Sequence, residues 1–203
     1  MPSYLFPFPA SRRSTTFWAL MFTLLLVGTD SRCFAQDGFT NWESPHVHPL
    51  DLTPSEERLL AVNTPDARLE VFDVSTGTPV LIDSIPVGLD PVSVRARTDS
   101  EVWVVNHVSD SVSIVDLELG TVVHTLETED EPADVVFAAN GRAFVSCSQA
   151  NSVLVFDAAN RSLVDVVPIA GEDPRALAVS PNGNVIYCAI FESGNASTLV
   201  RGG

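Results

Sequence analysis

Short apolar runs alternate with polar turns along residues 49–190. The runs are rich in Val, Ile, Leu and Phe, and in several of them polar and apolar residues alternate, as in Val112-Ser113-Ile114. A period of two residues is typical of β-strands, and no stretch shows the 3.6-residue period of an amphipathic helix. Asn140-Gly141 and Asn182-Gly183 favour tight turns, because both residue types tolerate positive φ. The pattern therefore predicts an all-β chain.

These runs recur as a unit of about 41 to 43 residues. Pro49, Pro91, Pro132 and Pro174 mark its start at intervals of 42, 41 and 42 residues, and four short runs follow each of the first three prolines. The sequence predicts a β-propeller of four-stranded antiparallel blades over residues 49–203, with blades starting near 49, 91, 132 and 174. Stacked sheets around an axis cover each other's apolar faces. A β-sandwich of the same strands is the alternative.

The third run of each complete unit ends in an aspartate: Asp73, Asp116 and Asp157. Gly77 and Gly120 stand four residues after the first two. A catalytic acid is needed once, whereas an acid that bonds to the backbone of a turn is needed in every blade. We therefore expect these aspartates to stabilise turns.

One segment resembles a known family. Residues 103–116, Trp-Val-Val-Asn followed by a polar loop and Val-Ser-Ile-Val-Asp, are similar to the YVTN repeat of bacterial and archaeal exported β-propellers. The resemblance covers roughly residues 46–195 and implies seven blades in the full protein. About three and a half blades are present here, so we expect the chain to be a fragment of a larger propeller. The family's propellers serve many roles, so the resemblance predicts the fold more than the function.

The first 35 residues have the pattern of a signal peptide. Arg12-Arg13 precede an apolar run of 11 residues, Phe17–Val27, and cleavage is predicted between Ala35 and Gln36. The run is shorter than the roughly 20 residues of a membrane-spanning helix, although a retained anchor is the alternative. We expect an exported protein, periplasmic or extracellular, without a membrane anchor after cleavage. Residues 36–48 would then form an N-terminal lead-in segment.

The chain is strongly acidic and contains no lysine. It has 11 basic and 26 acidic residues and a net charge of −15. Cleavage would remove three arginines and one aspartate, which leaves a net charge of −17. Such a surface repels phosphate backbones, so we expect no nucleic-acid partner. Cys147 and Cys188 occupy strand positions one step apart in register, which places them on opposite faces and predicts no disulfide between them.

A candidate site lies where the units join. Asp90, Glu131 and Asp173 each precede a repeat proline, and strand alternation places them on one face of the disc, around the mouth of a central channel. With His48 they are candidate ligands for a cation. The alternative is that acids simply favour solvated loops.

For the histidines themselves we expect ordinary positions rather than a metal site. His46, His48 and His107 are expected to be ordinary surface side chains, and His124 is expected to pack within its strand. A metal site would require a third ligand besides the His46-x-His48 pair.

The sequence contains no motif for a phosphate loop, a dinucleotide, a nucleophilic serine or covalent haem. No catalytic residue or cofactor is identified. We therefore expect a binding module whose loop face takes a protein, a polymer or a small ligand. One alternative is the N-terminal propeller of a periplasmic oxidoreductase or cytochrome-associated enzyme with its chemistry beyond residue 203. Another is a lactonase-like hydrolase, with acids and a histidine around a metal in the channel.

Overall fold

The computed structural model describes residues 45–192, which lie within the compact unit Trp42–Gly203. The predicted signal peptide and its cleavage site, Ala35 and Gln36, are outside the described residues. The first sheet contains β1 (Leu50–Leu52), β2 (Arg58–Asn63), β3 (Arg68–Asp73) and β4 (Val80–Pro86). The second contains β5 (Pro91–Ala96), β6 (Glu101–Asn106), β7 (Ser111–Asp116) and β8 (Thr121–Glu127).

The third sheet contains β9 (Pro132–Phe137), β10 (Arg142–Cys147), β11 (Ser152–Asp157) and β12 (Ser162–Pro168). The strands β13 (Glu172–Val179) and β14 (Ile186–Glu192) form an antiparallel pair. Every four-stranded sheet is antiparallel and keeps its strands in chain order. The prediction of an all-β chain with four-stranded antiparallel blades is therefore confirmed, and the β-sandwich alternative is wrong.

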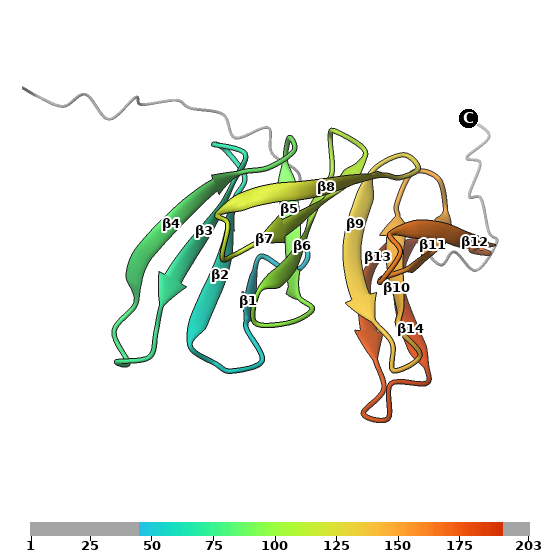
Figure 1. The fold of residues 1–203 in the computed structure, drawn as a ribbon. Coiled ribbons are helices and arrows are strands. Elements are labelled where there is room, and N and C mark those ends of the chain that lie inside the picture. The colour runs from blue at the N-terminus through green and yellow to red at the C-terminus, as the bar shows by residue number, and fades with distance from the viewer. Residues whose placement is uncertain (1–44, 193–203) are drawn as a thin grey trace, which may run out of the picture. The chain divides into compact units, whose positions relative to one another are not determined.

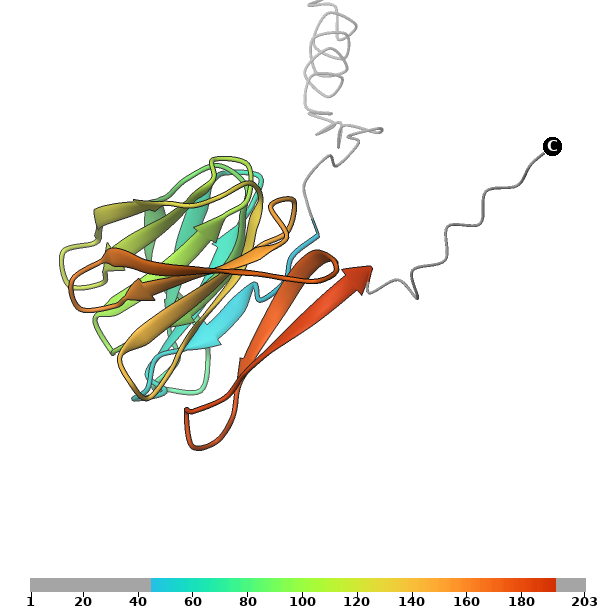
Figure 2. The same cartoon turned by 90° about the vertical axis from the view of Figure 1, so that its right-hand side faces the viewer.

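The first strands of successive sheets are neighbours, as Figures 1 and 2 show for β1, β5, β9 and β13. The side chain two residues after each of the first three prolines links its strand to the next sheet. Asp51 accepts a hydrogen bond from the Ala96 N–H at 2.9 Å, and Ser93 donates to the Ala133 carbonyl at 2.7 Å. Asp134 accepts from the Leu177 N–H at 2.9 Å.

The apolar core lies between the sheets rather than inside any one of them. Along β6, Val102 and Val104 pack towards the first sheet, whereas Trp103 and Val105 pack towards the third. The Trp103 ring meets Phe137 edge to face, with centroids 5.3 Å apart. Because both faces of β6 are covered, this strand is buried over almost its whole length.

The recurring aspartates bond to the turns that follow them. Asp73 accepts from Ser75, Asp116 from Glu118 and Leu119, and Asp157 from Ala159 and Asn160. These contacts confirm the predicted role. Gly77 and Gly120 adopt φ angles of 81° and 62°, which favour glycine.

Over residues 45–192 no helix is long and apolar enough to cross a membrane. Cys147 is a buried free thiol and Cys188 a partly exposed one.

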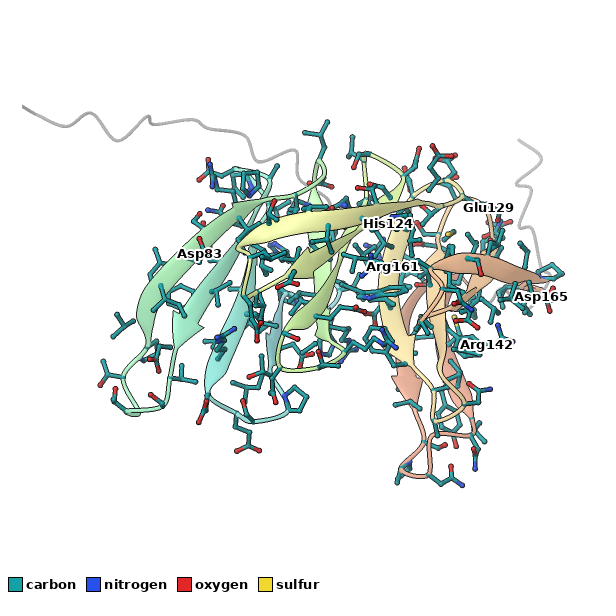
Figure 3. All side chains as sticks on the ribbon, viewed as in Figure 1. Asp83, His124, Glu129, Arg142, Arg161 and Asp165 are labelled. Carbon is teal, nitrogen blue, oxygen red and sulfur yellow. The ribbon has the colours of Figure 1, made fainter. Side chains whose placement is uncertain are left out.

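His124 is exposed on the outer strand β8 (Figure 3), so the expectation that it packs is wrong. An outer strand contacts neighbouring sheets less than an inner one, which leaves this mid-strand position open.

Candidate functional site

The three predicted acids stand at corners of the backbone at one end of the sheets, which we call the proline end. This end comprises the β4–β5, β8–β9 and β12–β13 connections and the β2–β3, β6–β7 and β10–β11 turns. Asp90, Glu131 and Asp173 have φ angles of 57°, 55° and 58°. This left-handed conformation is uncommon outside glycine and is tolerated best by Asp and Asn.

Hydrogen bonds to the adjacent turn hold each corner. The Glu131 N–H donates to Asp110 Oδ1, and the Asp173 N–H donates to Asn151 Oδ1, each at 3.0 Å. The Asp90 carbonyl accepts from the His107 N–H at 2.9 Å. The N–H contact therefore recurs at Glu131 and Asp173, and the carbonyl contact recurs at Asp90 and at Glu131, whose carbonyl accepts from the Ser148 N–H at 2.8 Å.

Two of the three acids line one hollow of about 440 Å³. Its wall combines the corner residue Glu131, side chains of the β10–β11 turn and residues of β13. The lining residues are Glu131, Ser148, Gln149, Asn151, Glu172, Asp173 and Arg175. The hollow thus lies between the third sheet and the β13–β14 pair, and its lining is polar throughout.

His107 stands directly behind Glu131. It is 5% exposed, so the expectation of a surface histidine is wrong for this residue. Its Nδ1 lies 2.9 Å from the carbonyl oxygen of Pro132. A carbonyl only accepts, so Nδ1 carries the hydrogen and Nε2 is left to face the Glu131 carboxylate, 3.6 Å away. The next sheet, which covers this loop, causes the burial.

The Glu131 carboxylate connects this histidine to the hollow. Its side chain is 41% exposed, and Oε2 also lies 3.4 Å from the Ser148 hydroxyl, which donates to the Glu131 carbonyl at 2.9 Å. The arrangement is a half-exposed carboxylate that lies against a buried imidazole, whose Nδ1 is engaged by a backbone carbonyl. Such a carboxylate can accept a proton from a water molecule in the hollow.

Arg175 supplies the positive charge of the hollow. Its guanidinium lies 3.6 Å from Asp173 and donates to the Pro45 carbonyl in the lead-in segment at 3.1 Å. Arg175 was not among the site residues predicted from the sequence. It could have been found because it directly follows the repeat proline, where the other units have the apolar residues Leu50, Val92 and Ala133.

The other two predicted ligands lie elsewhere. Asp90 does not line the hollow, and its Oδ2 is buried without a hydrogen-bond partner among the described residues. The His48 backbone pairs with β5 next to Ser93. Burial, together with the positive charge of Arg95, lowers the pKa of His48. Within residues 45–192 no three His, Cys, Asp or Glu side chains are grouped as a metal site would require.

A second polar cluster joins the inner strands. Asp134 is fully buried, and its carboxylate lies 3.3 Å from the Arg95 guanidinium besides accepting the bond from Leu177. Arg95 and Asp51 line a smaller hollow of about 280 Å³ at the opposite end of the sheets, beside Phe137. The carboxylates are already engaged with the backbone, so we assign this cluster a structural role.

Comparison with known proteins identifies the fold family. Residues 32–202 match the family model described as lactonase, 7-bladed β-propeller. An uncharacterized protein of Staphylococcus saprophyticus is 25% identical over 176 residues, which are 78% of this chain and 51% of that protein.

Two solved structures are similar. A putative 6-phosphogluconolactonase from Bacteroides uniformis has a TM-score of 0.60 and 25% identity, over 70% of this chain and 49% of that one. Hydrazine synthase from Kuenenia stuttgartiensis has a TM-score of 0.67 at 21% identity, over 79% of this chain and 46% of that one, and supports the fold alone. The chain spans about half the length of these relatives. It belongs to the lactonase family of seven-bladed β-propellers.

Proposed function

We propose that the hollow at the proline end is the substrate site of a lactone hydrolase. The observation that carries the proposal is the half-exposed Glu131 carboxylate, which lies against the buried His107 and lines the same polar hollow as Arg175. Membership of the lactonase family and the likeness to a putative 6-phosphogluconolactonase support the same reaction class. The propeller of this family therefore serves as a scaffold that positions a hydrolytic site.

The reaction opens a cyclic ester with one water molecule. Glu131 accepts a proton from the water, whose oxygen adds to the lactone carbonyl carbon. Arg175 donates hydrogen bonds to the oxyanion that forms. The bond between the carbonyl carbon and the ring oxygen then breaks, and the ring oxygen takes the proton held by Glu131. The products are one hydroxyl and one carboxylic acid, which releases its proton to solvent.

His107 acts in this scheme as a positioning residue. Its Nδ1–H is fixed by the Pro132 carbonyl, so Nε2 remains directed at Glu131. The ring thereby limits the positions that the Glu131 carboxylate can adopt at the edge of the hollow.

The strand sequences of the blades also support a YVTN-type repeat. Asn106, the asparagine of the tetrad, donates to Ser111 and Ser113 across the β6–β7 turn at 3.2 and 2.9 Å. In the first blade Asn63 donates to Glu70, which corresponds to Ser113, and to Asp66 in the turn. The asparagine therefore has a structural role, which explains why a repeat would contain it.

Hydrolysis of D-glucono-1,5-lactone by the full protein, followed by proton release near neutral pH, tests the proposed function. We expect Glu131→Gln to lower kcat by about 10²- to 10⁴-fold, the range typical of a general base. Asp130→Asn is the matched control, because Asp130 is an exposed acid in the same connection but does not line the hollow. Full activity of Glu131→Gln, or no hydrolysis of any lactone by the native protein, would contradict the proposal.

A further inference from the structure

We infer that the lactone bound in this hollow is neutral and polyhydroxylated, and that a phosphorylated lactone is rejected. The inference rests on the proposed hydrolase function and adds the class of substrate. It follows from the charge of the lining, from the hydrogen-bond donors that the lining has already used, and from the acceptors that remain.

The charge balance of the hollow is negative. Glu131, Glu172 and Asp173 contribute three carboxylates, against the single guanidinium of Arg175. That guanidinium lies 3.6 Å from Asp173 and also donates to the Pro45 carbonyl, so its donors are partly committed. A phosphate dianion in the hollow would therefore face a net repulsion at short range.

The backbone offers little compensation. Anion sites commonly use several free N–H groups that converge on one point. Here the N–H groups of Glu131, Ser148 and Asp173 donate to Asp110, to the Glu131 carbonyl and to Asn151 respectively. The Asn151 N–H donates to the Ser148 carbonyl. These four backbone N–H groups are therefore already hydrogen-bonded within the fold and are not free to bind a phosphate group.

The same lining suits hydroxyl groups. A sugar hydroxyl donates as well as accepts, and the carboxylates of Glu131 and Glu172 accept such bonds strongly because they are charged. The Gln149 side chain offers both a donor and an acceptor. A volume of about 440 Å³ is in the range of small-molecule sites. A neutral ring with several hydroxyls satisfies these groups without adding negative charge.

The charge of the whole chain acts in the same direction. With a net charge of −15 and no lysine, this chain repels approaching dianions at low ionic strength. A neutral lactone experiences no such repulsion. The charge of the lining and the charge of the whole chain therefore both favour a neutral lactone over a phosphorylated one.

The test compares kcat/KM for D-glucono-1,5-lactone with kcat/KM for its 6-phosphate in the full protein. We expect the neutral lactone to be preferred by at least about tenfold, and the preference to shrink when salt screens the repulsion. Equal or faster hydrolysis of the phosphorylated lactone would overturn the inference and leave the proposed function standing.

A charge reversal in the hollow sharpens this test. Glu172→Lys should raise the ratio of kcat/KM for the phosphorylated over the neutral lactone by about tenfold, because it removes one negative charge and adds a positive one. Glu118→Lys is the control, since it changes the net charge equally at an exposed position outside the hollow. If both variants change the ratio equally, the local charge of the hollow does not select the substrate and the inference is wrong.

A binding measurement separates this inference from the hydrolase function. The probes are the non-hydrolysable D-glucono-1,5-lactam and its 6-phosphate, and the readout is the thermal midpoint of the full protein. Stabilisation by the neutral lactam alone, without hydrolysis of either lactone, would support the substrate class and refute the hydrolase function. Stabilisation by the phosphorylated lactam alone, or by neither probe, would overturn the inference.

Discussion

Removal of the Asp134 carboxylate should destabilise the contact between neighbouring sheets more than removal of the Asp51 carboxylate at the same position of the repeat. Asp134 is fully buried, and its carboxylate receives hydrogen bonds from the Leu177 and Val135 N–H groups and from Arg95. In Asp134→Ala the guanidinium of Arg95, which is only 19% exposed, loses its anion. Breaking a buried ion pair from one side costs about 3–5 kcal/mol.

Asp51 provides a matched comparison, because it occupies the same repeat position. Its carboxylate accepts from the Ala96 and Leu52 N–H groups, but it is half-buried and forms no ion pair with an arginine of residues 45–192. The loss of hydrogen bonds at a half-exposed carboxylate costs about 1 kcal/mol. We therefore expect Asp134→Ala to lose roughly 2–4 kcal/mol more than Asp51→Ala.

Thermal unfolding followed by tryptophan fluorescence measures the difference. For a domain of this size, 1 kcal/mol corresponds to about 2–4 °C in Tm, so Asp134→Ala should lower Tm by roughly 10 °C and Asp51→Ala by roughly 3 °C. Asp134→Asn, which retains an acceptor but not the charge, should fall between them. Equal shifts for both alanine variants would refute the reasoning, because burial and the arginine partner would then contribute nothing.

Two further predictions concern titratable groups. Burial raises the pKa of both thiols, that of Cys147 to about 12, and Cys188 is the more exposed of the two. At about pH 8 a thiol reagent should therefore label Cys188 first, as peptide mapping by mass spectrometry would show. Equally fast labelling of Cys147 would contradict this. Burial alone would raise the pKa of Glu101, but hydrogen bonds from Arg97 and Trp103 lower it below its ordinary 4.5. The resulting stability is present above that value and is lost as the pH falls through the lowered pKa. Glu101→Gln should therefore lose less stability in urea than the native protein between about pH 5 and pH 3, and parallel losses would count against the assigned contacts.

The fold could be predicted from the sequence because its determinants lie within one repeat. Strand positions follow from the alternation of apolar residues, and the turn aspartates follow from their recurrence after each third strand. Contacts between repeats could not be predicted in the same way. Asp134 looks like a polar residue on an alternating strand, and its role depends on Leu177 in the next unit, 43 residues later.

The candidate site was predictable only in part for the same reason. Glu131 and Asp173 could be placed at one end of the sheets from their positions before the prolines, and both line the hollow. The burial of His107 could not be predicted, because its loop is covered by the following sheet. Asp90 shares the sequence pattern of the other acids, but it precedes a blade junction that does not contribute to this hollow.

Two residues of the candidate site, His107 and Arg175, differ from the residues at the same positions in the other blades. The first residue of the turn after the second strand is Thr64, His107 or Ser148. Thr64 and His107 donate a side-chain hydrogen bond to the carbonyl of the first residue of the next sheet, Pro91 and Pro132, whereas Ser148 donates to the Glu131 carbonyl before its own sheet. All three residue types bond to a backbone carbonyl, but only the histidine has a second nitrogen, which faces Glu131. Likewise, Arg175 replaces an apolar residue of the other units and gives the hollow its positive charge. Several residue types can satisfy the structural contact at such a position of the repeat. One blade can therefore have a side chain there that adds a function without loss of the fold.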